Sequence, residues 1–303
     1  MKSTRPQIQM PASVRRRGGV WGAAFSLVEI MVVVALLSLI ILALMAVFNS
    51  TQTAFRASVT QTDVQEGGRM AMDMVTTDLR AMAPSGMSTN LGTVNFYANT
   101  NVYYNSAFNE PLIQSLAPGT DLRTNVLEDI FILTKASTTW TGVGYVVDFG
   151  ATNYINPLYR FSMTTNVQSA NPQVLYRIFT NKVANADWSG MGRLLTGVVH
   201  FTVRAYGTNA QWLAFGCTNG PAQVSYFPQI FGTGGLIAYT NVVPAMVELQ
   251  LGVLEDRALR HAEGLFDATP TYYRSNYLAA QAGKVHLFRQ QVSIPNFDPA
   301  AYQ

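Results

Sequence analysis

The chain has 303 residues, a formal net charge of +3 at neutral pH and one cysteine, which excludes an intramolecular disulfide. Five of its 20 lysines and arginines lie in residues 1–24, which contain no acidic residue, so residues 25–303 carry 15 basic and 17 acidic side chains. The remainder is therefore slightly acidic, and its composition gives no support for nucleic-acid binding.

Residues 1–24 form a basic leader, and an apolar segment, residues 30–48, follows it. Between residues 30 and 48, only Ser38 is polar. A helix of 19 such residues, rising about 1.5 Å per residue, spans roughly the 30 Å hydrocarbon core of a bilayer. The run is too long for a secretory signal, and no small-residue cleavage site follows it. Because positive charge flanking an apolar span stays in the cytoplasm, we expect the remaining chain on the far side of the inner membrane.

Glu29 opens this apolar run. A carboxylate beside the hydrocarbon core costs about 2.5–3.5 kcal/mol even on lenient insertion scales. Its position therefore predicts a positively charged partner. The alternative is that the side chain merely extends to the membrane interface.

Residues 49–83 are more polar but contain no proline, and they predict a continuation of the same helix. Apolar side chains recur at three- and four-residue spacing, at Met72, Val75, Leu79 and Met82. Gly67 and Gly68 could loosen or kink the helix, and Pro84 should end it. We expect one helix of about 50 residues, with residues 25–48 in lipid and residues 49–83 packed on a soluble domain.

Residues 84–303 predict a β-rich globular domain, so the expected fold class is α+β with an antiparallel sheet. Apolar and polar side chains alternate in segments 158–163, 199–206 and 247–253, as in strands half covered by a core. Further strand candidates are 128–134, 143–149, 173–179 and 285–294. The charged residues between 253 and 260 predict a solvated strand end with local ion pairs.

No residue spacing indicates a catalytic or metal site. The histidines, His200, His261 and His286, show no His-x-x-x-His pattern, and one cysteine cannot form a thiolate cluster. Four acidic residues could gather around calcium, although their spacing matches no calcium-binding loop; they are Asp121, Glu128, Asp129 and Asp148. The sequence thus predicts no cofactor and no enzymatic activity.

The segment 24–32, Ala-Phe-Ser-Leu-Val-Glu-Ile-Met-Val, resembles the cleavage and methylation motif of type IV prepilins and type II secretion pseudopilins. The resemblance implies that a prepilin peptidase cuts between Ala24 and Phe25 and methylates the new Phe25 amine. That amine is a cation near neutral pH. In a filament it would pair with Glu29 of a neighbouring subunit. The chain departs from the family pattern in having Ala24 where glycine is usual.

Segments 52–56 and 65–80 look like the helix of PilW-type minor pilins and J-type minor pseudopilins, and segments 244–251 and 286–292 are similar to their closing strands. The resemblance implies a pilin-like fold and a minor pilin or pseudopilin that helps to initiate or cap a filament. Its implied partners are the prepilin peptidase, other pilins or pseudopilins and an inner-membrane assembly platform. Its periplasmic domain would follow a single membrane span.

Two other classes of function stay open from the sequence. A membrane-anchored exported enzyme would use the helix only as a tether, and it requires a catalytic constellation in residues 84–303. An adhesive or ligand-binding module displayed on a filament requires only surface. The residues do not distinguish a type IV pilus from a type II secretion system or a DNA-uptake apparatus.

Overall fold

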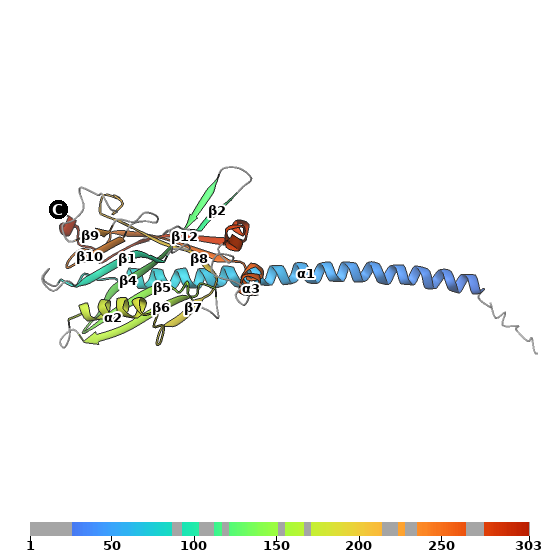
Figure 1. The fold of residues 1–303 in the computed structure, drawn as a ribbon, viewed down its shortest axis with the longest axis horizontal. Coiled ribbons are helices and arrows are strands. Elements are labelled where there is room, and N and C mark those ends of the chain that lie inside the picture. The colour runs from blue at the N-terminus through green and yellow to red at the C-terminus, as the bar shows by residue number, and fades with distance from the viewer. Residues whose placement is uncertain are drawn as a thin grey trace, which may run out of the picture. The chain divides into compact units, whose positions relative to one another are not determined.

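The computed structural model describes residues 26–86, 93–102, 112–116, 121–150, 155–166, 171–213, 224–227, 235–264 and 276–302. The chain divides into two compact units, Met1–Phe55 and Arg56–Gln303. Helix α1 (Leu27–Arg80) contributes its first part to one unit and its second part to the other (Figure 1). The two units are described separately below.

The described part of the first unit is the beginning of α1, which is apolar from residue 30 to residue 48 apart from Ser38. Its hydroxyl side chains bond back to carbonyls one turn earlier. Ser38 Oγ donates to the carbonyl of Val34 at 2.8 Å. The hydroxyls of Thr51 and Thr53 each donate in the same way to the carbonyl four residues earlier. These bonds satisfy polar groups within the helix, as a hydrocarbon environment requires.

In the second unit, α1 packs on a β-sheet through the predicted apolar stripe. Met72, Val75 and Leu79 are buried, as is Met82 just beyond the helix end, so the predicted stripe is confirmed. The helix continues through Gly67 and Gly68 without a break. Gly68 lies against the ring of Phe288, which explains a glycine there by close packing.

Within the described residues, ten strands form one sheet. They are β1 (Val94–Val102), β4 (Leu127–Ala136), β5 (Thr139–Val147), β6 (Leu158–Asn166), β7 (Gly192–Leu195), β8 (Val198–Tyr206), β9 (Val224–Phe227), β10 (Gly235–Tyr239), β11 (Met246–Leu254) and β12 (Val285–Ser293). The order is β12-β11-β8-β4-β1-β10-β9, and β5, β6 and β7 branch from β4. The named pairings are antiparallel except for one parallel bridge, Leu127 with Phe201. The α+β prediction is confirmed at this level.

The remaining elements are short. Strands β2 (Leu112–Ser115) and β3 (Leu122–Asn125) form a separate hairpin. Helix α2 (Gln173–Ala184) contacts β5 and β6, and α3 (Asp256–Gly264) follows β11 (Figure 1). Residues 276–279 are helical, and two 3₁₀ segments, Ala282–Lys284 and Pro299–Tyr302, lie on either side of β12.

The central strands are covered on both faces, so the expectation of a half-covered sheet is wrong for them. One core cluster contains the α1 stripe, and another contains Leu175 and Phe179 of α2. Residues 127–133 of β4 are all buried. Two polar residues on the supposedly solvated faces, His200 and Glu248, are buried as well.

Among the further strand candidates, 128–134, 143–149 and 285–294 are confirmed as β4, β5 and β12, but 173–179 is wrong. That segment opens α2, in which Leu175 and Phe179 lie one turn apart and are both buried. They pack where Gly142 and Gly144 of β5 leave room for them. Contacts with the sheet therefore override the β-propensity of this apolar segment.

At residues 253–260 the expected strand end and local ion pair are present, but most of the segment is helical rather than extended. Strand β11 ends at Leu254 and α3 begins at Asp256. The local ion pair is helical, because Arg260 Nη2 lies 2.9 Å from Asp256 Oδ2 at i,i+4 spacing.

Candidate functional site

Glu29 lies in the first turn of α1, three residues after Ser26, whose side chain caps the start of the helix. Its backbone N–H donates to Ser26 Oγ at 3.2 Å, and the N–H of Ile30 donates to the Ser26 carbonyl at 3.2 Å. Ser26 is thus the N-cap of α1. The Ser-x-x-Glu spacing from Ser26 to Glu29 is a recognisable helix-start pattern, so this cap was missed although the sequence signals it.

The helix that follows Glu29 exposes apolar side chains on every face. Each large apolar side chain from residue 27 to residue 48 is at least 51% exposed. Among the described residues, α1 is the helix long and apolar enough to cross a membrane, with a mean hydropathy of 3.2 over 18 residues. A helix that is apolar all round requires a surrounding apolar phase or other apolar chains.

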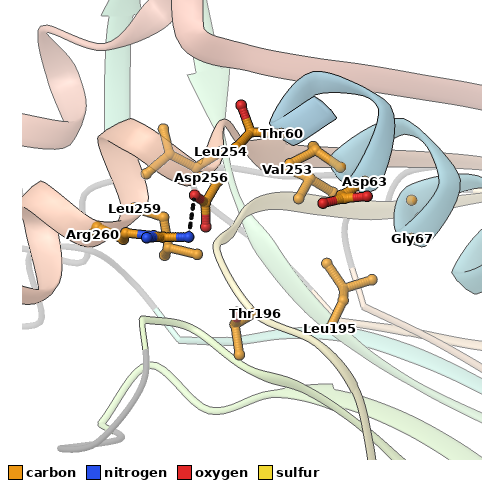
Figure 2. A pocket seen from close by; sticks show the side chains of 12 residues that line it. Thr60, Asp63, Gly67, Leu195, Thr196, Val253, Leu254, Asp256, Leu259 and Arg260 are labelled. Atoms are coloured by element: carbon orange, nitrogen blue, oxygen red, sulfur yellow. Dashed lines mark ion pairs between the residues drawn. The ribbon is translucent and has the colours of Figure 1, made fainter. Parts of the chain in front are cut away.

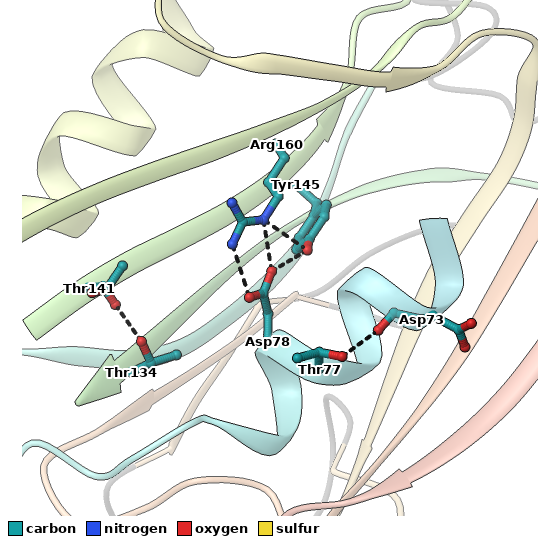
Figure 3. A network of polar contacts seen from close by, with 7 residues as sticks. All are labelled: Asp73, Thr77, Asp78, Thr134, Thr141, Tyr145 and Arg160. Carbon is teal, nitrogen blue, oxygen red and sulfur yellow. Dashed lines mark hydrogen bonds and ion pairs between the residues drawn. The ribbon is translucent and has the colours of Figure 1, made fainter. Parts of the chain in front are cut away.

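The end of α1 in the second unit is attached to the sheet by an ion pair. Arg160 of β6 donates from Nε to Asp78 Oδ2 at 2.9 Å and from Nη2 to Asp78 Oδ1 at 3.0 Å (Figure 3). The hydroxyl of Tyr145, opposite Arg160 on β5, donates to the same carboxylate. A bidentate pair with a third donor fixes both the rotation and the height of the helix on the sheet.

Both donors stay protonated over the physiological pH range. Burial and the hydrogen bond to Asp78 raise the pKa of Tyr145 far above its ordinary value. The hydrogen bond to Asp78 likewise raises the pKa of Arg160. The three side chains therefore form a structural contact, since neither donor can release a proton under ordinary conditions.

The three histidines lie in separate environments. His200 is buried in β8, where its Nδ1 accepts from the Val126 N–H at 3.3 Å. Burial and the charge of Arg123 lower the pKa of His200 to about 4, so it is neutral in the folded protein. His261 of α3 packs against the ring of Tyr277, and His286 lies on β12.

The acidic residues considered for calcium are likewise not assembled into a site. In the part of the chain that the structure describes, no group of three His, Cys, Asp or Glu side chains could hold a metal ion. The carboxylate of Glu128 is buried, and its Oε2 accepts from the N–H of Val203 at 2.7 Å. The Glu128 carboxylate therefore acts as a hydrogen-bond acceptor for a backbone N–H of the sheet.

A cavity of about 280 Å³ lies beside the second part of α1 (Figure 2). Its apolar lining includes Val64 of α1, Leu195 at the end of β7 and Leu259 of α3. Asp63 and the ion pair of Asp256 with Arg260 add charge to the lining. Three chain segments, 60–68, 195–196 and 253–260, line this cavity, and no single one of them indicates it in the sequence.

A search of protein-family models, curated proteins and solved structures finds no match to this chain. Of the residues predicted for processing and assembly, Ala24 and Phe25 lie outside the described residues. Glu29 is described, at the start of an exposed apolar helix.

Proposed function

We propose that this chain is a structural subunit of a membrane-derived filament, a minor pilin or pseudopilin that helps to initiate or cap it. The observation that carries the proposal is the position of Glu29. It is an acid in the first turn of a helix whose next 19 residues are apolar apart from Ser38. Such an acid requires a cation inside an apolar environment.

Proteolytic processing supplies that cation. Cleavage between Ala24 and Phe25 creates an α-ammonium group four residues before Glu29 and removes five basic side chains. The amine of one subunit then pairs with Glu29 of its neighbour, so charge neutralisation selects one arrangement of packed apolar helices. Before assembly, α1 holds the chain in the inner membrane with its β-rich unit in the periplasm.

The second part of α1 supports the same role. The helix that presents Glu29 also carries the buried stripe and Asp78, which attach it to the sheet. One unbroken helix thus carries both Glu29 and the residues that pack on the sheet.

Processing is tested by expressing the full chain with and without a prepilin peptidase. We expect a loss of about 2.5 kDa, the mass of a 24-residue leader, and a mature N-terminus at a methylated Phe25. N-terminal sequencing and mass spectrometry read both changes. An unchanged initiator methionine in the presence of an active peptidase would reject the proposal.

The role of Glu29 is tested by Glu29→Val, with Ser38→Val as the matched control. Both changes replace a polar residue of the same helix by valine. We expect both variants to enter the membrane, but only Glu29→Val to lose co-purification with the other filament subunits. Equal co-purification of the two variants would contradict the charge-pairing role.

A further inference from the structure

Gly67 lies in the middle of α1, where no neighbouring atom requires a residue without a side chain. A Cβ at residue 67 would meet nothing within 4 Å, whereas a Cβ at neighbouring Gly68 would overlap the Phe288 ring. Glycine inside a helix is unfavourable relative to alanine. The missing side chain of Gly67 instead leaves open space at the wall of the cavity (Figure 2).

The charges around the cavity do not balance. Asp256 is paired with Arg260 at 2.9 Å. Asp63, on the same side of α1 as Gly67, has no ion pair among the described residues. The ionisable lining therefore carries one net negative charge above an apolar wall that includes Val64 and Leu259.

We propose that this cavity receives one apolar side chain, followed by a basic residue, from a neighbouring filament subunit. The inference rests on the proposed function, for which it names a contact surface. A cavity of about 280 Å³ is slightly below the usual range for small-molecule sites, roughly 300–1,000 Å³. It suits a single anchoring side chain, and aromatic and arginine residues are the commonest anchors of protein interfaces. The basic residue meets Asp63.

The ligand preference is tested on the full chain in detergent micelles with leucine methyl groups labelled for NMR. The probes are N-acetyl-phenylalanyl-arginine amide and N-acetyl-phenylalanyl-glutamate amide. We expect saturable shifts of the methyl groups of Leu195, Leu254 and Leu259 with the arginine probe, and at least twofold weaker binding of the glutamate probe. Equal binding of both probes, or no shift at these leucines, would overturn the proposal.

Two variants separate binding in the cavity from adsorption to the micelle. Gly67→Leu places a side chain in the open space and should abolish the shifts, while Met70→Leu, at an exposed position on the same helix, should leave them unchanged. Asp63→Asn should weaken binding of the arginine probe by roughly two- to fivefold. Binding of the glutamate probe should not become weaker. Shifts that persist in a folded Gly67→Leu protein would also overturn the proposal.

The contact between filament subunits is tested by co-purification of the chain with its neighbouring subunits. Gly67→Leu should keep processing and membrane insertion but reduce recovery with the neighbouring subunits, whereas Met70→Leu should not. Undiminished recovery of Gly67→Leu contradicts the docking site while leaving the proposed function intact. If processing or the Glu29→Val experiment fails instead, the proposed function fails, and the probe experiment still decides what the cavity binds.

Discussion

Phe288 of β12 occupies the space that a side chain on Gly68 of α1 would need. This contact joins two segments that lie 220 residues apart in the chain. It lets the helix backbone approach the edge of the sheet closely. A Cβ on the adjacent Gly67 would meet open space instead, so the two glycines provide opposite tests of packing.

Gly68→Ala should lower the free energy of unfolding by about 1–3 kcal/mol, because the ring or the helix must shift to admit the methyl group. Gly67→Ala should raise it by about 0.5–1 kcal/mol through helix propensity. Thermal unfolding of the full chain, followed by circular dichroism, measures both, with about 2–4 °C per kcal/mol expected for a chain of this size. Shifts of the same sign would contradict the packing described for α1.

Asp78→Ala should destabilise the second unit by about 1.5–3 kcal/mol, since it leaves the guanidinium of Arg160 and the hydroxyl of Tyr145 without their shared acceptor. The matched control is Asp73→Ala on the exposed face of the same helix, which has no ion pair among the described residues. We expect less than about 0.5 kcal/mol there. Similar thermal shifts for the two variants would show that the ion pair does not anchor the helix.

His200 should make the protein sensitive to mild acid. Its pKa is about 4 in the folded protein against an ordinary value of 6.5, so the unfolded chain binds a proton that the folded chain does not. The free energy of unfolding should therefore fall as the pH drops from 6.5 towards 4, by on the order of 3 kcal/mol. His200→Asn keeps an acceptor for the Val126 N–H without titrating. Denaturant unfolding at several pH values should show a shallower slope for this variant, and an unchanged slope would be evidence against the assignment.

Glu248 contributes at a lower pH. Burial opposes its ionisation, but hydrogen bonds from Arg289, Gln250 and Gln291 outweigh burial and lower its pKa to about 2. Because the folded pKa lies below the ordinary 4.5, the stabilisation is fully present above pH 4.5 and is lost as the pH approaches 2. Glu248→Gln should thus be destabilising at pH 7, with a difference from wild type that shrinks below pH 4.5. A difference independent of pH would refute this role.

Local periodicity predicted α1 and six of the twelve described strands because it reports local burial. The stripe on α1 follows from spacing alone, and β4, β5, β6, β8, β11 and β12 follow from runs of strand-forming residues. Helix α2 escaped prediction because its sequence combines β-branched and aromatic residues, and only contact with β5 makes it helical.

The long-range contacts could not be predicted from the sequence for a different reason. Asp78 and Arg160 are 82 residues apart, and nothing in either neighbourhood identifies the other as its partner. The cavity could not be predicted for the same reason, since three segments far apart in the sequence line it. Ser26, in contrast, lies three residues before Glu29 and could have been recognised from its spacing.

The bond from Ser38 to the Val34 carbonyl has a consequence for specificity inside a bilayer. With that hydroxyl internally satisfied, residues 30–48 offer hydrocarbon surface and no outward polar group. Exchanging leucines, isoleucines and valines within this stretch would change the shape of the helix surface but leave that surface entirely hydrocarbon. In the proposed filament, the chemical distinction between correct and incorrect helix neighbours would therefore be concentrated in the first turn of α1, where Glu29 lies.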